Sequence, residues 1–282
     1  MSTKRLFLFA AYDRAGNIDA SLEYYVGALS KYGDVIVHMD SDCRDGSIKK
    51  LMPYTIHADA RRHGEYDFGS YKRAYTHARN ADILSDYDFV YMVNDSVYGP
   101  LADIGPALHA MESMGVDAFG PVCNPNPDHP HIQSWFIGMR PTVFLSPWFE
   151  KFITSVRPQT NKGTITKLYE QGFTALVAGH NLSWGCLWNV ENRGVYNKIK
   201  KLYRTGLPFM KKVAFSRHGG RLGRQILYVL GHISPTARDA IMENARRTYG
   251  VEYMDWLLTN NPVKIFMRGL KYGIKKARKG QL

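Results

Sequence analysis

A short apolar stretch that ends in three polar residues constrains this chain more than any other feature. Phe89–Val93 is apolar, β-branched and aromatic, which is typical of a strand buried on both faces. Asn94, Asp95 and Ser96 follow directly, and Gly99-Pro100 then breaks the chain. In an open α/β sheet, ligands bind beyond the carboxyl ends of the strands. The pattern predicts a ligand or metal site at Asp95; the alternative is a turn in which these side chains bond the local backbone.

Strand-like and helix-like segments alternate along the first 195 residues. We predict strands at Arg5–Ala11, Asp34–Met39, Thr55–Ala58, Phe89–Val93, Ala118–Pro121 and Gln133–Met139. The predicted helices are Ala20–Tyr32, Gly69–Ala81, Ala107–Met114, Pro147–Ser155, capped by Ser146, and Thr164–Gln171. Such alternation predicts βαβ units, and therefore an α/β fold with a mainly parallel sheet flanked by helices.

The net charge of +12 is distributed unevenly along the chain. Residues 196–282 carry 19 Lys and Arg against 4 Asp and Glu, a net charge of +15. Residues 1–195 carry 18 against 21, a net charge of −3. This contrast predicts two domains, residues 1–195 and a basic helical extension, residues 196–282.

The basic extension contains four predicted helices that mix apolar and basic residues. They are Val195–Leu207, Gly223–His232, Ala237–Tyr249 and Val263–Lys279. Helices of this kind suit an anionic membrane surface. A packed helical extension with a solvated basic face is the alternative, and nucleic-acid binding is disfavoured because no known nucleic-acid motif is present.

Cysteine usage and hydropathy narrow the class of protein further. Cys43, Cys123 and Cys186 lie far apart without a Cys-X-X-Cys spacing, which predicts neither a disulfide framework nor a zinc site and favours a reducing compartment. The basic N-terminus leads into a short apolar run, which we interpret as a first strand rather than a signal peptide. No run of 18 apolar residues exists, so no membrane-spanning helix is expected.

A second segment, His63–Lys72, lies where the third predicted strand should lead into a helix. Asp67 or Ser70 could cap that helix and leave its free N–H groups facing a phosphate. Lys72 adds positive charge nearby. The alternative interpretation is a simple helix cap with an aromatic core anchor.

Two further segments combine polar and aromatic side chains. His131 and Gln133 lead into an aromatic strand that contains Trp135, a combination suited to gripping a sugar; the alternative is a polar loop before a core strand. Glu170 stands among Leu, Tyr and Phe residues and is a candidate general base, or else a surface glutamate. His180 could be a base, a metal ligand or a histidine at a strand end.

Taken together and in this order, the segments resemble the rhamnan synthesis F family of bacterial polysaccharide glycosyltransferases. The resemblance spans roughly residues 5–190 and excludes the basic extension. The matching residues are Tyr66–Lys72, Tyr87–Asp88, Asn94–Pro100, His131–Phe136 and Tyr169–Gly172.

The resemblance implies a GT-A-like, Rossmann-like fold and a glycosyltransferase that is expected to be inverting. The expected reaction moves rhamnose or a similar sugar from a nucleoside-diphosphate donor to a growing O-antigen or cell-wall glycan. The expected acceptor is linked to a polyprenyl diphosphate or is another glycan, and the enzyme would be cytoplasmic and peripheral at the inner face of the cytoplasmic membrane. The alternative is a non-catalytic sugar- or nucleotide-binding scaffold of a polysaccharide synthase complex.

The resemblance also makes Asn94-Asp95-Ser96 the counterpart of an Asp-X-Asp motif that holds Mg²⁺ or Mn²⁺. Here Asn94 and Ser96 replace the outer carboxylates, and a single carboxylate holds such an ion less firmly. A cation such as Lys72 is therefore the alternative partner of the diphosphate.

These arguments give a set of expected site residues. Asp95, which would also hold any metal, and Glu170 are the expected catalytic residues. The remaining expected contacts are to the donor, by Asp67, Ser70, Lys72, Asn94 and Ser96, and to the sugar or acceptor, by His131, Gln133, Trp135 and His180.

Overall fold

The computed structural model describes residues 3–43, 46–191, 193–217 and 221–267. The chain forms two compact units, each with its own hydrophobic core. The first unit comprises residues 1–95 and 103–192, and the second comprises residues 96–102 and 193–282. Asp95 is thus the last residue of the first unit before the chain enters the second.

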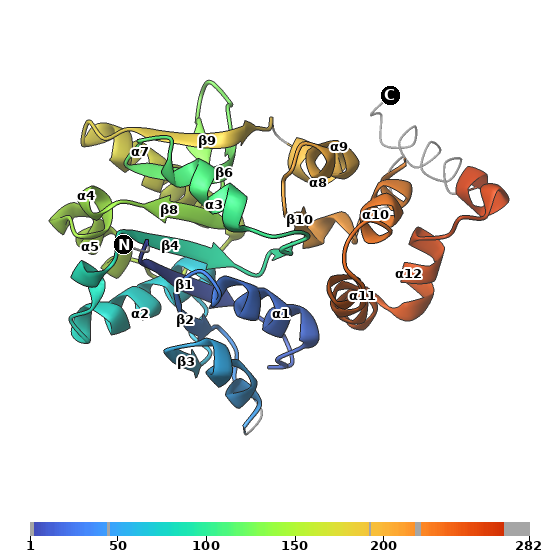
Figure 1. Ribbon diagram of the computed structural model, residues 1–282, viewed down its shortest axis with the longest axis horizontal. Helices are drawn as coiled ribbons and strands as arrows, with labels where there is room; N and C mark the ends of the chain where they lie inside the picture. The colour runs from blue at the N-terminus through green and yellow to red at the C-terminus, as the bar shows by residue number, and fades with distance from the viewer. Residues whose placement is uncertain (1–2, 44–45, 192, 218–220, 268–282) are drawn as a thin grey trace. The chain divides into compact units, whose positions relative to one another are not determined.

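The first unit is built on one mixed sheet (Figure 1) with the strand order β3-β2-β1-β4-β8-β6-β7, and β9 pairs with β6. Strands β1, β2, β3 and β4 are parallel, as are β6 and β9, whereas β8 is antiparallel to β4 and β6. The predicted α/β class and mainly parallel sheet are confirmed. The strands are β1 Arg5–Ala11, β2 Asp34–Met39, β3 His57–Ala60, β4 Phe89–Asn94, β6 Ala118–Asn124, β7 His131–Ile132, β8 Phe136–Met139 and β9 Trp184–Asn189.

Strand β4 is central and all six of its residues are buried, as its apolar sequence predicts. In the register of the sheet, Asn94 pairs with Ala10 of β1, and the Asp95 amide donates to the Ala10 carbonyl. The carboxyl ends of β1, β2 and β4 therefore lie at the same edge of the sheet.

Helices cover both faces of this sheet. Alternate residues of β1 face opposite sides: Phe9 contacts Tyr25 of α1, whereas Leu8 lies in the core formed with α2, α5 and α7. The helical segments are α1 Ala20–Leu29, η1 Ser47–Tyr54, α2 Tyr66–Asn80, η2 Leu84–Asp86, α3 Gly105–Glu112, α4 Pro141–Phe144, α5 Pro147–Thr154, α6 Lys162–Ile165, η3 Thr166–Gln171 and α7 Gly172–Gly179. The predicted cap of α5 is confirmed, because the Ser146 hydroxyl accepts a hydrogen bond from the Phe149 amide.

Several boundaries differ from the sequence predictions for local reasons. The strand predicted over Gln133–Met139 is divided into β7 and β8, because Gln133–Trp135 forms a turn closed by a bond from the Phe136 amide to the Gln133 carbonyl. The helix predicted at Thr164–Gln171 becomes η3, a π-helical segment that continues into α7. Strand β9 was not predicted, because Trp184–Asn189 lacks a clear apolar alternation.

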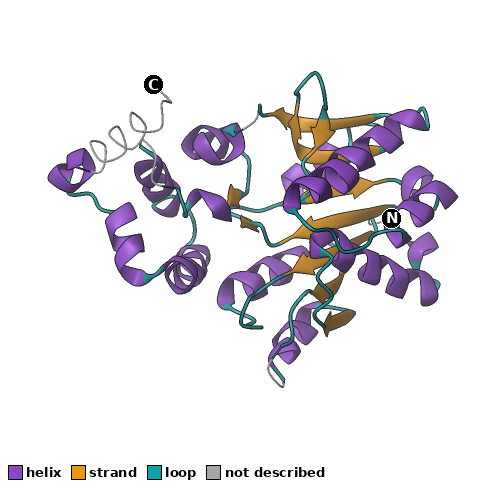
Figure 2. Ribbon diagram, turned by 180° about the vertical axis from the view of Figure 1, so that it is seen from behind, coloured by secondary structure: helices purple, strands orange, loops and turns teal. Residues whose placement is uncertain are grey.

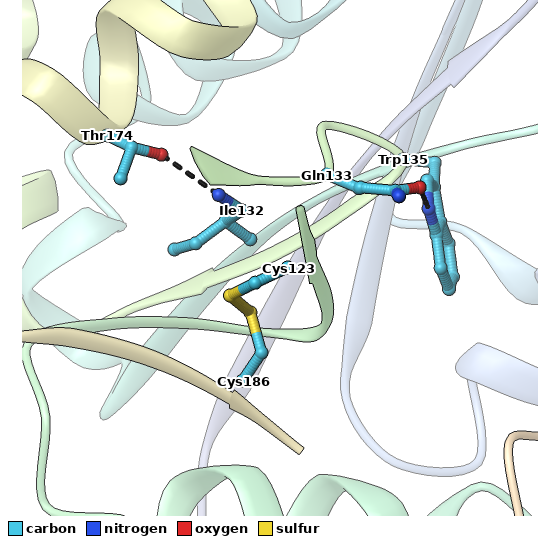
Figure 3. The surroundings of a disulfide bond; sticks show 6 residues. All are labelled: Cys123, Ile132, Gln133, Trp135, Thr174 and Cys186. Atoms are coloured by element: carbon cyan, nitrogen blue, oxygen red, sulfur yellow. Dashed lines mark hydrogen bonds between the residues drawn. A yellow bond between two sulfur atoms is a disulfide. The ribbon is translucent and has the colours of Figure 1, made fainter. Parts of the chain in front are cut away.

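The expectation of no disulfide is wrong. Cys123 of β6 and Cys186 of β9 form a disulfide, with 5.7 Å between their Cα atoms. Figure 3 shows this bond beside Ile132 of β7, which pairs with Cys123 across the sheet. Cys43 is a free thiol. The three cysteines are therefore one bonded pair and one unpaired residue.

The second unit is mainly helical (Figure 2). Its short strands β5 and β10 pair antiparallel, and the buried Tyr98 hydroxyl donates to Asn244 at 2.5 Å. Its elements are β5 Val97–Tyr98, α8 Gly194–Asn197, α9 Ile199–Arg204, β10 Met210–Lys211, η4 Lys212–Ala214, α10 Leu222–Leu230, α11 Pro235–Tyr249 and α12 Val251–Leu257.

The apolar faces of these helices pack against one another. Ile226, Val229, Ile241, Met254 and Leu257 share one core and are almost fully buried. The predicted amphipathic helices up to residue 257 therefore form a packed helical extension, because their apolar faces are not available to a bilayer. Of the helix predicted at Val263–Lys279, residues 262–267 are helical and the remainder lies outside the described residues.

No helix in the described ranges is long and apolar enough to cross a bilayer.

The disulfide yields a stability prediction. Cys186→Ser should lower the free energy of unfolding by about 2–4 kcal/mol, because a crosslink between residues 63 positions apart restricts the unfolded chain. Thermal unfolding with and without dithiothreitol measures this effect. Cys43→Ser is the matched control and should leave both the midpoint and its sensitivity to the reductant unchanged. Equal midpoints for oxidised wild type and Cys186→Ser would contradict the assignment.

Candidate functional site

The end of β4 is joined to the first turn of α2. The buried Asn94 amide nitrogen donates to the Asp67 carboxylate at 3.1 Å. Asp95, the next residue, is half-buried at the edge where the parallel strands end. Two residues expected at the donor site, Asp67 and Asn94, are therefore in direct contact, and the expected catalytic Asp95 adjoins them.

The Gln133–Trp135 turn packs against this same strand end. The backbone N–H of Asn94 donates to the Trp135 carbonyl at 3.1 Å. The Tyr71 hydroxyl of α2 donates to the Ser134 carbonyl at 3.0 Å. The turn is thus held between β4 and α2, beside the Asn94–Asp67 pair.

Two buried tyrosines at this edge have raised pKa values, and the neighbouring carboxylates contribute to the increase. Burial, together with the neighbouring Asp67 carboxylate, raises the pKa of Tyr71 well above its usual value. Burial and the charge of Asp95 raise the pKa of Tyr25 in the same direction. Both phenols therefore remain protonated beside these carboxylates.

Glu170 also contacts the Gln133–Trp135 turn. It lies in the π-helical segment η3, a distortion that is frequent at functional sites. Its Oε1 accepts from the Ser134 amide at 3.3 Å and lies 3.9 Å from Nε2 of His131. Nδ1 of His131 is 2.7 Å from the His129 carbonyl, so it carries the proton of that bond and Nε2 faces Glu170. The structure thus brings His131 and Glu170 together.

The expected sugar-stacking role of Trp135 is corrected by its burial. The ring is 2% exposed, so no sugar can stack on it. Its indole nitrogen donates to Oε1 of Gln133 at 2.9 Å, and Gln133 is itself buried (Figure 3). Both side chains therefore shape the turn from inside.

The start of α2 also differs from the prediction. The helix begins three residues earlier than expected, with Glu65 as its N-cap residue, and no side chain caps it. Neither Asp67 nor Ser70 is the cap. Ser70 is buried, and its hydroxyl lies 3.0 Å from Nε2 of His63.

Lys72 has a different partner from the expected diphosphate. Its ammonium group lies 2.6 Å from the buried Glu65 carboxylate and donates to the Val156 carbonyl at 2.9 Å. Arg73 binds the same carboxylate at 2.5 Å. Burial would raise the pKa of Glu65, but the bonds from Lys72 and Arg73 outweigh it and hold that pKa below its usual value. Lys72 therefore supports the turn before α2.

The structure does not bring His180 to this group. His180 ends α7, stacks on Trp148 and precedes β9, whose first residue lies at the amino end of the sheet, opposite Asp95. Ser96 belongs to the second unit, where its hydroxyl accepts from the Lys211 ammonium at 3.1 Å.

Sequence reasoning missed a further group at the ends of β1 and β2. Tyr12, after β1, is 46% exposed, and the Arg62 guanidinium lies 5.1 Å from the centre of its ring. Asp40, after β2, accepts from the His63 and Gly64 amides at 2.7 and 3.0 Å. The signal was present, because polar residues follow both strands just as Asp95 follows β4.

A hard divalent cation at this edge would require oxygen ligands. Among the described residues, no group of three or more His, Cys, Asp and Glu side chains could hold a metal ion. Asp67, however, supplies a second carboxylate in contact with Asn94, the neighbour of Asp95. Two carboxylates with an amide and a bound diphosphate would satisfy the oxygen preference of Mg²⁺ or Mn²⁺.

A family model described as rhamnan synthesis protein F matches residues 35–277. The chain belongs to the rhamnan synthesis protein F family. The match extends through the basic second unit, which corrects the expectation that this part lies outside the family. Family membership supports a glycosyltransferase that uses a nucleotide-sugar.

Solved structures resemble the chain only distantly. One described as a nucleotide-diphospho-sugar transferase from Desulfovibrio desulfuricans G20 has a TM-score of 0.44 at 15% identity and covers 88% of this chain and 99% of that chain. The mannosyltransferase Ktr4p of Saccharomyces cerevisiae has a TM-score of 0.31 at 9% identity, covering 54% and 59%. At such values these similarities establish neither a ligand nor a reaction. None of the curated proteins matches the chain.

Two buried histidines next to this edge predict a pH dependence. Burial lowers the pKa of His38 and of His63 to about 4, whereas unfolded imidazoles titrate near 6.5. The unfolded chain therefore binds more protons between these values, and stability should fall as the pH drops from 6.5 towards 4.

Thermal midpoints measured between pH 7 and pH 5 test this prediction. The wild-type midpoint should fall with pH, and His38→Gln should flatten the dependence because one buried imidazole is removed. The exposed His129 is the control, and His129→Gln should keep the wild-type slope. A wild-type midpoint that does not change over this range would contradict the pKa assignments.

Proposed function

We propose that this protein is a glycosyltransferase that moves rhamnose or a similar sugar from a nucleoside-diphosphate donor to a growing bacterial surface glycan. The observation that carries the proposal is the joined group Asp67, Asn94 and Asp95 at the carboxyl edge of a mainly parallel sheet. This is where an open α/β sheet binds its ligands. Family membership agrees with a nucleotide-sugar as the donor.

In the proposed reaction, an acceptor hydroxyl attacks the anomeric carbon while the bond from that carbon to the diphosphate breaks. Asp67, Asn94 and Asp95 position the diphosphate end of the donor. A divalent cation held by Asp67 and Asp95 would offset the charge of the leaving diphosphate. Tyr25 and Tyr71 stay neutral near these carboxylates, because burial and the neighbouring negative charges raise the pKa of both phenols.

The proton of the acceptor hydroxyl passes to Glu170 in this proposal, with inversion at the anomeric carbon. Glu170 is one-fifth exposed, so it is accessible to an acceptor, and the Ser134 amide fixes its Oε1. Nε2 of His131 lies 3.9 Å from the same oxygen. A base must lie within hydrogen-bond reach of the hydroxyl, which a side chain held by a rigid turn can achieve.

Asp95→Asn should reduce kcat/KM for nucleotide-sugar turnover by at least about a hundredfold, because the variant loses the charge at the diphosphate while keeping its shape. Initial rates with a panel of nucleotide-sugars and thermal unfolding of the same samples measure this. Asp82→Asn is the control: Asp82 is exposed after α2 with a φ of +56°, which Asn adopts equally well. Turnover close to wild type in Asp95→Asn would refute the assignment.

Glu170→Gln should lower kcat by about a hundredfold or more and leave the KM for the donor nearly unchanged, because a general base acts in the transition state. An unchanged kcat would exclude Glu170 as the base.

We also propose that the protein acts at the inner face of the cytoplasmic membrane on an acceptor linked to a polyprenyl diphosphate. Residues 261–282 contain seven Lys and Arg and no Asp or Glu. Val263 and Phe266, near the start of this segment, are 68% and 65% exposed. A basic segment with exposed apolar residues suits an anionic membrane surface.

Removal of residues 261–282 tests the membrane proposal without disturbing the core shared by α10, α11 and α12. The full chain should sediment with vesicles that contain anionic lipid, and the shortened chain should bind them at least about tenfold more weakly. Both should bind neutral vesicles poorly. Equal binding of the two chains to anionic vesicles would refute the proposal.

The second candidate is a non-catalytic sugar- or nucleotide-binding scaffold of a polysaccharide synthase complex. It would retain nucleotide binding at Asp67 and Asn94 but would need no base at Glu170. Binding of a nucleotide-sugar without hydrolysis or transfer to any acceptor in the panel would favour the scaffold.

A further inference from the structure

Tyr66 has a strained backbone. Its φ of +57° lies in the left-handed region, which bulky residues rarely adopt. Asp82 and Asn181 share this conformation, but Asp and Asn enter it readily through local hydrogen bonds. A tyrosine has no such compensation, so its presence here costs stability and needs another explanation.

The surrounding turn over-determines this conformation. The preceding residue, Glu65, is buried between Lys72 and Arg73, and its amide donates to Nδ1 of His63 at 3.0 Å. A Cβ atom at Gly69 would lie 2.2 Å from the Glu65 Cβ, so only glycine allows this close approach. These contacts fix the backbone at Glu65, immediately before Tyr66.

The Tyr66 side chain is largely exposed for an aromatic residue. It is 44% exposed, whereas Phe68, two residues later, is 2% exposed and anchors α2 in the core. Among the residues that the structure describes, none forms a hydrogen bond, an ion pair or a ring contact with Tyr66. No polar or ring contact with a described residue accounts for a tyrosine at this strained position.

The position of Tyr66 adjoins the proposed donor site. The next residue, Asp67, accepts from Asn94, and Asn94 precedes Asp95. An aromatic side chain with a free face is therefore fixed one residue from the group to which we assign the diphosphate.

We propose that Tyr66 forms one face of the subsite for the donor sugar, with its ring against the apolar face of the pyranose; this inference rests on the proposed function. The sugar is covalently attached to the diphosphate, so it must lie next to the residues that hold the diphosphate. The carboxylate of Asp67, the next residue in the chain, can accept hydrogen bonds from sugar hydroxyls, and it disfavours a second anion at this place. A flat aromatic face beside a polar acceptor is the combination that recognises a sugar.

The test compares the affinity for a nucleoside diphosphate with that for its sugar conjugate. Isothermal titration with dTDP and dTDP-L-rhamnose, and with GDP and GDP-mannose, is carried out on the full chain with Mn²⁺ present. The variants are Tyr66→Ala, Tyr66→Gly and Tyr66→Phe. Asp82→Gly is the control for backbone strain, because it relieves a similar φ away from the site.

Tyr66→Ala and Tyr66→Gly should bind the nucleotide-sugar at least about tenfold more weakly and the free diphosphate within twofold of wild type. Tyr66→Phe, which keeps the ring, should stay within about threefold for both ligands. The thermal midpoint of Tyr66→Gly should equal or exceed that of wild type, because glycine adopts the left-handed region without strain. Asp82→Gly should bind both ligands as wild type does.

Two results would overturn the inference, and they are distinguishable. If the alanine and glycine variants bind the nucleotide-sugar as wild type does, or lose both ligands in parallel, Tyr66 does not face the sugar while the proposed function stands. If wild type binds neither member of either ligand pair, the proposed function fails and the inference fails with it.

Discussion

The hydrogen bond from the Asn94 amide to the Asp67 carboxylate connects the centre of the sheet with the helix that covers it. Asn94 is buried at the end of the central strand, where an unpaired amide would cost about 1–3 kcal/mol. The bond satisfies that amide and at the same time fixes a carboxylate next to Asp95. The Gln133–Trp135 turn, Tyr71 and Glu170 are arranged around this pair.

Two sets of buried contacts support this arrangement. The ion pairs of Glu65 with Lys72 and Arg73 hold the turn before α2, while the bond between the Trp135 indole and Gln133 fills the turn after β7. These groups contact one another, and Lys72 also donates to the Val156 carbonyl. They position the few exposed groups that remain, which a rigid site requires.

Much of the fold could be predicted from the sequence, because apolar runs such as Phe89–Val93 and the residues that follow them have only one consistent interpretation in an α/β sheet. The position of Asp95 at the end of the central strand followed from the same pattern, whereas the contact of Glu170 with the Gln133–Trp135 turn did not. Burial could not be predicted: Trp135 looks like a sugar platform in the sequence but faces inward. The placement of the Asp67 carboxylate against Asn94 depends on a contact between residues 27 positions apart in the sequence. No local pattern encodes such a contact.

Other features depend on three-dimensional pairing that the sequence does not reveal. An odd number of scattered cysteines gave no sign of the bond between Cys123 and Cys186, which exists because β9 returns parallel to β6. The left-handed conformation of Tyr66 follows from the burial of Glu65 against Gly69 and has no sequence signature of its own. The basic helices looked like membrane-binding elements until their apolar faces were found packed together.

The most direct test of this account is a crystal structure of the protein soaked with a nucleoside diphosphate and Mn²⁺. The account predicts an anomalous manganese peak bonded to carboxylate oxygens of Asp67 and Asp95, with the diphosphate on the same ion. A diphosphate bound away from the end of β4, with no contact to either carboxylate, would contradict it.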